Sequence, residues 1–259
     1  MKRIGRLWGD VLTETNGVSA VVEGTLFKRY KVKKLLYDDS YVAQHRECWH
    51  MIDPDKARKY IRPVIEELRD MSWKHSAPKT ARRFCVSRTA AGGKWRTLYV
   101  PGLKDHIVAH MVMQVAMPAF TKGMHHGCCG SVPGRGIKYI VENTENWFRH
   151  DRQCRYFVKL DIRKFFDNID RDILVAKLQS KIKDQYVLWA FEQIIDSAPV
   201  ACPIGYYTSP WFANLYLEGL DHMIDGLGKE RRGKRIRYVR HYLRYMDDML
   251  LVGTSKKDL

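Results

Sequence analysis

Apolar residues recur with two different periods along this chain, and these periods predict helices and strands in alternation. The segment 53–71 begins with Asp-Pro, a pair typical of a helix N-terminus, and then carries apolar residues on one helical face. Its Pro63 is expected to kink the helix or to restart it. Helical periodicity is also found in residues 104–120, 171–195 and 211–225.

Strand patterns lie between these helices. Residues 82–101 predict two strands joined by a glycine-containing turn, and an apolar strand is predicted just before Asp161. The last strand pattern, at 241–253, is interrupted by two aspartates. This order predicts an α+β protein in which a mixed sheet carries helices on one face. The first fifty residues are basic and only weakly periodic, and no repeat or low-complexity segment marks a linker.

The charge balance constrains the partners of the protein. The chain has 45 Lys and Arg against 29 Asp and Glu, a net charge of +16, which favours a polyanionic partner such as nucleic acid. No apolar run approaches the ~18–20 residues needed to span a bilayer, and the N-terminus lacks the features of a signal peptide. The six cysteines are scattered without a disulfide framework, which fits a reducing cytosol. We therefore expect a cytoplasmic protein without a membrane partner.

Two adjacent aspartates, Asp247 and Asp248, interrupt the apolar pattern near the C-terminus. Neighbouring residues of one strand point to opposite faces, so both carboxylates serve one site only if they lie at the tip of a hairpin. Crowding two negative charges there is costly unless a cation is bound. Because aspartate is also common in solvated turns, the pair alone does not distinguish a metal site from an ordinary turn.

A third carboxylate, Asp161, ends the apolar segment YFVKL. If that strand lies beside the hairpin, the three carboxylates form one cluster. Such a cluster suits two Mg²⁺ ions roughly 4 Å apart, with Mn²⁺ as a substitute. One ion would lower the pKa of an attacking 3′-hydroxyl and the other would hold the triphosphate, which is the chemistry of nucleotidyl transfer.

Several motifs, taken in order, resemble those of reverse transcriptases. YMDD between apolar runs is similar to the palm hairpin of that family, and FVKLDIRKFFDNID resembles its first catalytic motif. GKWRTLYVP resembles the fingers hairpin, GSVPGRG a template-side loop of bacterial enzymes, and PIGYYTSPWFANLYLEGLD the segment beneath the incoming nucleotide. The resemblance covers residues 82–253. It implies the fingers and palm of a right-hand polymerase, with an antiparallel palm sheet and helices on one of its faces.

The resemblance assigns roles to residues of the first catalytic motif and of the hairpin. It implies that Asp161, Asp247 and Asp248 bind the metal ions, with the backbone carbonyl of Ile162 as a further ligand. Phe166 matches the steric gate, whose ring excludes a ribose 2′-hydroxyl and so favours dNTPs over NTPs. This gate argues against an RNA-directed RNA polymerase. The alternative role for either of the two adjacent phenylalanines is core packing.

Basic residues are assigned to nucleotide and nucleic-acid binding in the same way. Arg96 matches the fingers arginine that grips the triphosphate, with Lys94 and Arg88 as secondary candidates. Gly205 would line the nucleotide side, where glycine permits close backbone approach. Contacts to the nucleic-acid backbone are expected from Arg135, Ser209, Arg231, Arg232, Arg235 and Arg237. The last four lie in a basic run, which on charge alone is equally typical of a solvated surface.

The HHGCCG sequence from His125 to Gly130 invites a zinc interpretation. Adjacent His-His and Cys-Cys pairs splay apart, and their spacing matches no strong zinc pattern. We therefore favour a loop that packs near the template.

The expected division is a basic N-terminal extension at 1–52, fingers at 53–150 and a palm at 151–259, with fingers and palm interleaved. The family ordinarily continues into a primer-gripping hairpin and a helical thumb, which the eleven residues after Asp248 cannot hold. We therefore expect the thumb to be absent from this chain and the polypeptide alone to polymerise poorly.

The expected function is RNA-directed DNA synthesis from dNTPs on a dedicated structured RNA, with a DNA or RNA primer. The short PIGxxxS form is closer to bacterial diversity-generating and defence-associated enzymes than to group II intron enzymes, which show QGG before SP. A bacterial or phage-encoded enzyme with an accessory protein or an oligomeric assembly fits these types. Two alternatives stay open: a maturase-like RNA-binding scaffold with little polymerase activity, and protein-primed or untemplated DNA synthesis.

Overall fold

The computed structural model describes residues 3–25, 53–86 and 93–259, and it shows an α+β protein. The chain forms two units, each made from two separate stretches of sequence. Unit 1 comprises Met1–Ala119 and Leu178–Thr208, and unit 2 comprises Phe120–Lys177 and Ser209–Leu259. The predicted α+β class and the antiparallel sheet that the resemblance implies are confirmed. The mixed sheet expected from the order of elements is wrong, because all pairs of strands in the described residues are antiparallel.

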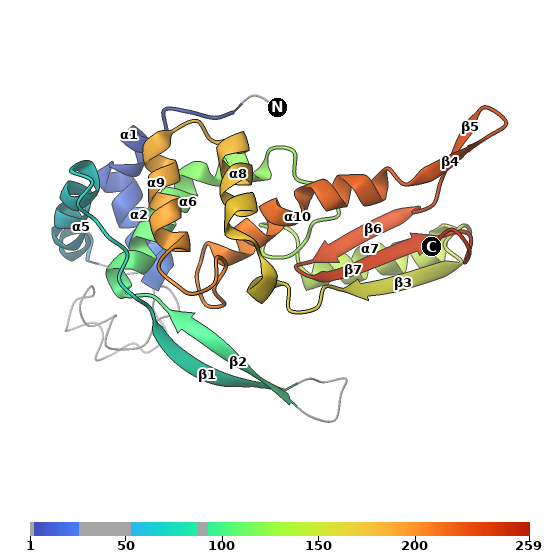
Figure 1. Cartoon of the computed structure of the whole chain (residues 1–259), viewed down its shortest axis with the longest axis horizontal. Coiled ribbons are helices and arrows are strands. Elements are labelled where there is room, and N and C mark those ends of the chain that lie inside the picture. Colours follow the sequence, from blue (N-terminus) through green and yellow to red (C-terminus); the bar gives the residue numbers. More distant parts are fainter. Residues whose placement is uncertain (1–2, 26–52, 87–92) are drawn as a thin grey trace. The chain divides into compact units, whose positions relative to one another are not determined.

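Figure 1 shows the helices of unit 1 packed around one another, and apolar residues of each are buried. These helices are α1 (Trp8–Val11), α2 (Glu14–Thr25), α5 (Pro54–Arg69), α6 (Leu103–Thr121) and α9 (Gln185–Ile195). Helix α5 begins where the sequence predicts, because the Asp53 side chain accepts hydrogen bonds from two backbone N–H groups of its first turn. The helix is not restarted at Pro63. Its Ile61 packs against Gly17 of α2 so closely that a Cβ there would overlap it.

The predicted helix 171–195 is two helices in the structure, α8 (Arg171–Lys181) and α9. Asp184 separates them, because its carboxylate caps α9 through two backbone N–H groups. The same carboxylate accepts hydrogen bonds from the backbone of Leu7 and Trp8, at 2.7 and 2.9 Å. The segment is therefore helical as its periodicity predicts, and a capping aspartate within it starts the second helix.

Strands β1 (Lys79–Val86) and β2 (Gly93–Val100) form the predicted antiparallel hairpin of unit 1. Lys79 lies opposite Val100, so the two strands pair along their whole length. The turn between them, at 87–92, lies outside the described residues.

Unit 2 is built on a three-stranded antiparallel sheet in the order β3–β7–β6 (Figure 1). The strands are β3 (Tyr156–Asp161), β6 (His241–Tyr245) and β7 (Asp248–Gly253). Helix α10 (Ser209–Asp225) packs on this sheet through a core in which Ile224 lies against Tyr242, Met249 and Leu251. The last strand in the sequence is therefore the central one, and this strand starts at Asp248.

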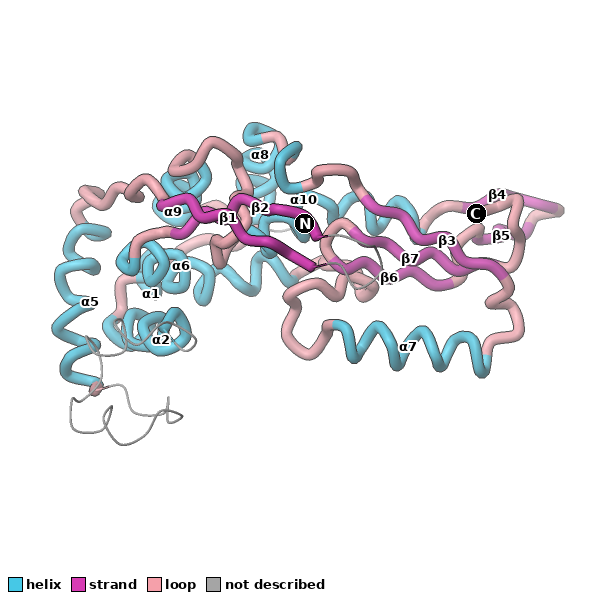
Figure 2. The backbone as a smooth tube through the Cα atoms, turned by 90° about the horizontal axis from the view of Figure 1, so that it is seen from below, coloured by secondary structure: helices cyan, strands magenta, loops and turns pink. Residues whose placement is uncertain are grey.

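Helix α7 (Ile137–His150), which the sequence analysis did not predict, runs along the same sheet (Figure 2). Trp147 stacks on His241 with ring centroids 4.3 Å apart, and Phe148 meets Phe157 edge to face. These contacts tie the end of α7 to the starts of β6 and β3.

A further hairpin of unit 2, made of β4 (Gly228–Arg231) and β5 (Lys234–Arg237), follows α10 (Figure 1). From the sequence, this segment is predicted only as a basic run. Arg232 and Gly233 both have positive φ, 53° and 72°, as in the type I′ turns that join tight hairpins. None of the described helices is both long and apolar enough to cross a membrane.

Candidate active site

The strand register brings the predicted aspartates to one end of the unit 2 sheet. Asp161, the last residue of β3, lies directly opposite Asp248, the first residue of β7. Directly opposed residues of antiparallel strands have Cβ atoms roughly 4.5–5.5 Å apart on one face, so these two carboxylates share one site. Asp247 is the preceding residue, and its carbonyl accepts a hydrogen bond from the Ile162 N–H at 3.3 Å.

Met246 and Asp247 form the turn between β6 and β7, since Tyr245 pairs with Asp248. Met246 has a φ of 56°, a left-handed conformation that costs a non-glycine residue about 1–2 kcal/mol. The sequence places both aspartates at the tip, whereas in the structure Asp248 has already joined β7. The chain reversal still frees Asp247 from the strand alternation, which is what a shared site requires.

A lysine lies beside these carboxylates. Nζ of Lys159, two residues before Asp161 on β3, is 3.1 Å from Oδ1 of Asp248. Both side chains are largely exposed, so the pair adds little stability. The Asp248 carboxylate therefore already binds one positive charge, the ammonium group of Lys159. The oxygen donors of this site therefore fit a hard divalent cation such as Mg²⁺ or Mn²⁺.

The carboxylate oxygens of Asp161, Asp247 and Asp248 do not all lie within 4.8 Å of one another. Among the described residues, the group of three potential ligands whose donor atoms lie within 4.8 Å of one another is Asp151, Cys154 and His241, at the other end of the sheet. There Nε of Arg240 is 2.8 Å from an Asp151 oxygen that also contacts His241 at 3.0 Å. The hydrogen bond from Arg240 lowers the pKa of Asp151, so this carboxylate already has a cationic partner.

Phe165 and Phe166 differ in burial. Phe165 is 5% exposed and packs against Tyr216 of α10, with ring centroids 6.3 Å apart. Phe166 opens the short 3₁₀ helix η1 (Phe166–Asn168) and is only partly buried. Because one ring fills the core and the other stays accessible near Asp161, Phe166 rather than Phe165 is the candidate gate.

The predicted triphosphate contacts belong to unit 1. Arg96 is exposed on β2, opposite Arg83 in the strand register. Trp95 beside it is 60% exposed. Lys94 belongs to β2 by its backbone, and Arg88 lies outside the described residues. The role of all three basic residues stays a prediction.

Gly205 is required by the backbone of unit 1 itself. Its φ is 116°, and a Cβ at this position would overlap the carbonyl oxygen of Tyr99 on β2. The Tyr99 N–H donates to the carbonyl of Ile204 at 2.8 Å. The close approach that the sequence analysis assigned to a nucleotide is therefore made by β2.

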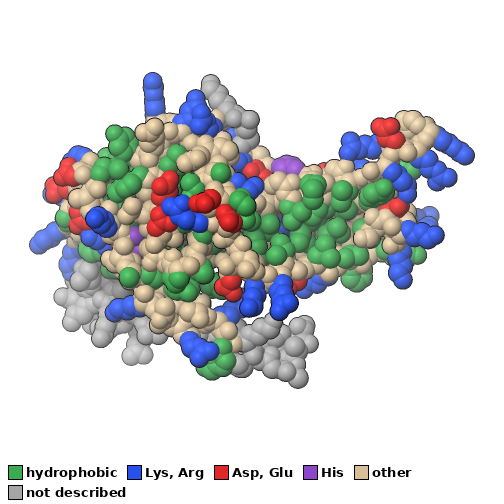
Figure 3. Space-filling view, in the orientation of Figure 1, with side chains coloured by type: hydrophobic (Ala, Val, Ile, Leu, Met, Phe, Trp, Pro, Cys, Tyr) green, Lys and Arg blue, Asp and Glu red, His purple; other side chains and the backbone are tan. Residues whose placement is uncertain are grey.

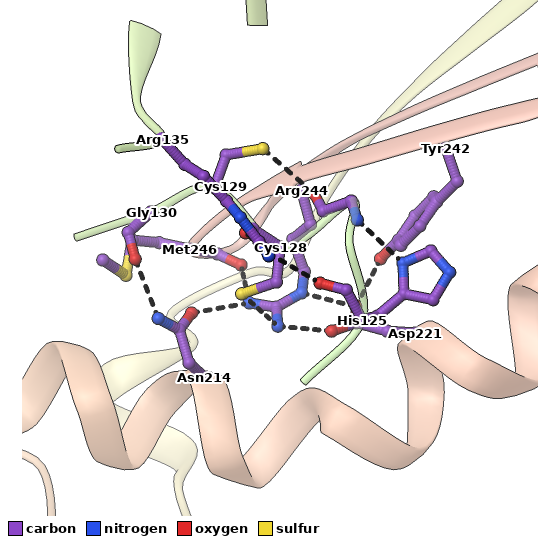
Figure 4. A network of polar contacts seen from close by, with 11 residues as sticks. His125, Cys128, Cys129, Gly130, Arg135, Asn214, Asp221, Tyr242, Arg244 and Met246 are labelled. Carbon is purple, nitrogen blue, oxygen red and sulfur yellow. Dashed lines mark hydrogen bonds and ion pairs between the residues drawn. The ribbon is translucent and has the colours of Figure 1, made fainter. Parts of the chain in front are cut away.

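The HHGCCG loop is bound to strand β6 of the β6–β7 hairpin (Figure 4). The Arg244 N–H donates to Gly127 at 2.7 Å, and the Cys129 N–H donates to Arg244 at 2.8 Å. Burial raises the pKa of Cys128 and of Cys129 to about 11, so both thiols stay protonated at neutral pH.

Two predicted nucleic-acid contacts have internal roles in unit 2. One Nη of Arg135 donates to the carbonyls of His125 and Cys128, at 3.0 and 2.9 Å, and so closes the loop (Figure 4). Ser209 is 2% exposed at the first position of α10. A nucleic-acid strand would reach Arg135 through its remaining donors, and would reach Ser209 only if it were uncovered.

The predicted basic residues of the β4–β5 hairpin are all exposed, and Figure 3 shows Lys and Arg side chains gathered on it. Arg235 donates to the carbonyl of Gly226 at 2.6 Å, and Arg237 is ion-paired with Asp225. Arg231 and Arg232 form no ion pair with the described part of the chain. The hairpin thus presents two uncommitted guanidinium groups at its tip.

Three buried polar residues of unit 2 were missed by the sequence analysis: Asn214 and Asp221 on α10 and Arg244 on β6. They are at most 1% exposed, and Asp221 accepts two 2.6 Å hydrogen bonds from Arg244. Burial disfavours the charged guanidinium, but these bonds outweigh it and raise the pKa of Arg244. Strand alternation puts Arg244 on the same core-facing side as Tyr242, and this is the signal that could have revealed a buried charge in need of a partner.

The chain matches the family model "Reverse transcriptase (RNA-dependent DNA polymerase)" over residues 78–259. This range includes the β1–β2 hairpin, the first catalytic motif and the aspartates of the turn. The match covers more than half of the chain. The protein therefore belongs to the reverse transcriptase family.

Relatives of this chain include an intron protein and a retron reverse transcriptase. The chain is 29% identical over 228 residues to an uncharacterized 91 kDa protein in cob intron of Schizosaccharomyces pombe, covering 83% of this chain and 28% of that protein. It is 25% identical over 191 residues to the Retron Ec73 reverse transcriptase of Escherichia coli, covering 70% and 55%. A solved partial Cas6-RT-Cas1--Cas2 complex contains a chain with a TM-score of 0.43 and 18% identity, covering 96% of this chain and 38% of that chain. This chain therefore spans less than two thirds of each of these proteins.

Proposed function

We propose that this protein is an RNA-directed DNA polymerase that adds dNTPs to a primer by metal-assisted nucleotidyl transfer. The observation that carries the proposal is the direct opposition of Asp161 and Asp248 in the β3–β7 register, with Asp247 in the adjoining turn. The family match over residues 78–259 supports the same reaction.

In this proposal Asp161, Asp247 and Asp248, with the carbonyl of Ile162, hold two divalent cations, Mg²⁺ or Mn²⁺. Bound there, the cations would lower the pKa of the primer 3′-hydroxyl and neutralise the charge of the triphosphate. The contribution of the chain is positioning. The β3–β7 pair holds the carboxylates in place before substrate binds, so the charges need little reorganisation during the reaction.

Two residue types are proposed to select and hold the nucleotide. Phe166 offers an aromatic ring and no polar group to accept a ribose 2′-hydroxyl, which favours dNTPs. Arg96, with Lys94 on the same strand and Arg88 as secondary candidates, is proposed to bind the triphosphate, because the planar guanidinium matches phosphate oxygens. The hairpin belongs to unit 1, which we propose as fingers, and the aspartates belong to unit 2, which we propose as palm.

The β4–β5 hairpin is proposed to contact the sugar–phosphate backbone of primer or template. Arg231 and Arg232 at its tip would make the main contacts, with Arg235, Arg237, Arg135 and Ser209 secondary. Such contacts depend on charge and not on sequence. The net charge of +16 supports a nucleic-acid partner.

We propose a bacterial or phage-encoded retroelement as the biological setting, in the cytoplasm. Similarity to a retron reverse transcriptase of Escherichia coli supports a dedicated structured RNA as template. A diversity-generating or phage-defence system, with an accessory protein or an oligomeric assembly, is the specific form we favour from the PIGxxxS segment.

The test is template-directed addition of one nucleotide. The purified chain, in excess over a primer annealed to RNA, is given Mg²⁺ and each of the four dNTPs in turn. We expect addition only of the dNTP complementary to the template base. Addition of any dNTP irrespective of template would support untemplated synthesis, and tight RNA binding without addition would support the scaffold alternative.

A further inference from the structure

The guanidinium of Arg244 is buried in unit 2 and uses all of its hydrogen-bond donors (Figure 4). An arginine has five N–H groups in a fixed planar fork. Nε and Nη2 bind the two oxygens of Asp221, each at 2.6 Å. Nη1 donates to Asn214 Oδ1 at 3.1 Å and to the Met246 carbonyl at 3.0 Å. Nη2 also lies 3.3 Å from Cys128 Sγ, which accounts for the fifth N–H.

The contact with Met246 links this buried charge to the active site. The Met246 carbonyl belongs to the peptide bond that joins Met246 to Asp247. Arg244 therefore holds the plane of that peptide, and a rotation of the plane would move the Asp247 carboxylate. The contact also falls on a strained residue, since Met246 has a φ of 56°. Strained backbone persists where the surrounding contacts over-determine it.

The glycine-rich loop braces the same turn from another side. A Cβ at Gly130 would lie 2.8 Å from the backbone nitrogen of Met246, so only glycine leaves room for this approach. The Asn214 side chain donates to the Gly130 carbonyl at 2.8 Å and accepts from Arg244. Helix α10, the loop and the turn therefore meet at one guanidinium.

We propose that Arg244 is a positioning residue: paired with Asp221 on α10, it fixes the Met246–Asp247 turn in the geometry needed for nucleotidyl transfer. The proposal rests on the proposed polymerase function. Arg244 does not itself contact substrate or metal. The pair also explains why a charged residue stands on the core-facing side of β6, where an unpaired charge would be strongly destabilising.

The test compares two Arg-to-Lys substitutions. Arg244→Lys keeps the charge but replaces the fork by a single ammonium, which cannot hold Asp221 and Met246 in the same geometry. Arg240→Lys is the matched control, since Arg240 pairs with Asp151 at the other end of β6. Both variants are assayed for melting temperature, primer–template affinity and single-turnover addition of one dNTP.

We expect Arg244→Lys to fold and to bind primer–template as the wild type does. Its maximal rate should fall by roughly 10²-fold with little change in the KM for dNTP, because a misplaced carboxylate affects the transition state more than binding. Arg240→Lys should stay within about twofold of wild type. Hydrogen exchange should become faster in the peptide containing residues 245–249 of Arg244→Lys and not of Arg240→Lys.

A folded Arg244→Lys variant with wild-type rate and wild-type exchange in the turn would overturn the proposal. If Arg244→Lys does not fold, Asn214→Ala is tested in its place, because it removes one hydrogen-bond partner of Arg244 Nη1 and keeps the ion pair with Asp221. Faster hydrogen exchange in the turn together with a lower rate of dNTP addition would support the proposal. No change in the exchange or in the rate would overturn it. If the wild type adds no nucleotide, the proposed function fails. The exchange measurement then still decides whether Arg244 holds the turn.

Discussion

Adjacent side chains at the candidate active site differ in how far they are buried, and this separates structural from functional roles. Phe165 and Phe166 follow each other in the sequence, yet only Phe165 fills the core. The sequence singled out the three aspartates as candidate site residues, because a carboxylate within an apolar strand pattern is costly unless it has a polar or cationic partner. Sequence alone could not say which phenylalanine remains accessible, since this depends on the packing of Tyr216 from a distant segment.

The two phenylalanines should respond differently to truncation. Phe166→Ala should increase incorporation of NTPs relative to dNTPs with little loss of stability, because it removes the ring proposed to exclude a 2′-hydroxyl. Phe165→Ala should instead lower the free energy of unfolding by about 3–5 kcal/mol, as expected for a buried phenylalanine. Single-nucleotide addition and chemical denaturation measure the two effects. Unchanged sugar selectivity in Phe166→Ala would remove it as the gate.

Lys159 should compete with divalent cations for Asp248. Lys159→Ala removes the ammonium group 3.1 Å from the carboxylate, so we expect the Mg²⁺ concentration for half-maximal activity to fall. The change should be at most about fivefold, because exposed ion pairs contribute up to about 1 kcal/mol. Lys257→Ala, at an exposed lysine, is the control. A higher Mg²⁺ requirement in Lys159→Ala would contradict this account.

The cysteine pair of the loop should be chemically inert. Burial raises the pKa of Cys128 and Cys129 to about 11, and the reactive form of a thiol is the thiolate. At pH 8 we expect iodoacetamide to modify Cys154, which is partly exposed, well before either residue of the pair. Mass spectrometry of the labelled peptides measures this order. Rapid labelling of Cys128 or Cys129, or zinc bound to both, would contradict it.

At the scale of elements, the sequence predicted well the features that neighbouring residues determine. It predicted poorly the features that depend on contacts between distant segments. The Asp-Pro start of α5 and the β1–β2 hairpin follow from neighbouring residues. Helix α7 was missed, since its stacking contact with β6, between Trp147 and His241, joins residues 94 positions apart. The Arg244–Asp221 pair joins β6 to α10 across 23 residues, so no local pattern contains it.

The junction between α7 and β6 should give the protein an acid-sensitive stability. Hydrogen bonding to Arg240 lowers the pKa of Asp151, so the ionised carboxylate stabilises the folded state. A lowered carboxyl pKa contributes stability above its unfolded value of about 3.9, and this stability is lost as pH falls below that value. The melting temperature of wild type should exceed that of Asp151→Asn at pH 7, and the gap should narrow progressively as the pH falls below about 4. A gap independent of pH would contradict the assignment.

At the scale of the whole molecule, amino-acid composition is enough to indicate the class of partner. An excess of positive charge fits nucleic acid, and the β4–β5 hairpin collects part of that excess on one exposed element. Composition could not show this gathering, because it depends on the turn at Arg232 and Gly233 that folds the basic run back on itself.

The tip arginines should control the salt dependence of nucleic-acid binding. Arg231→Ala and Arg232→Ala should each reduce the slope of log affinity against log salt by about 0.7–0.9, the value for one lost phosphate contact. Arg237→Ala should change the slope less, because its guanidinium is already paired with Asp225. Fluorescence anisotropy across a salt series measures the slopes. Equal slopes in wild type and both tip variants would exclude the hairpin from binding.

The most direct test of the central claim is primer extension on an RNA template with Mg²⁺, comparing wild type with Asp247→Ala. Asp172→Ala, at an exposed aspartate of α8, is the control for loss of a carboxylate. With the chain in excess over primer–template, we predict addition of at least one dNTP and of no NTP by wild type and Asp172→Ala, and no addition by Asp247→Ala with RNA binding retained. Equal extension by Asp247→Ala would contradict the assignment of this carboxylate cluster as the polymerase active site.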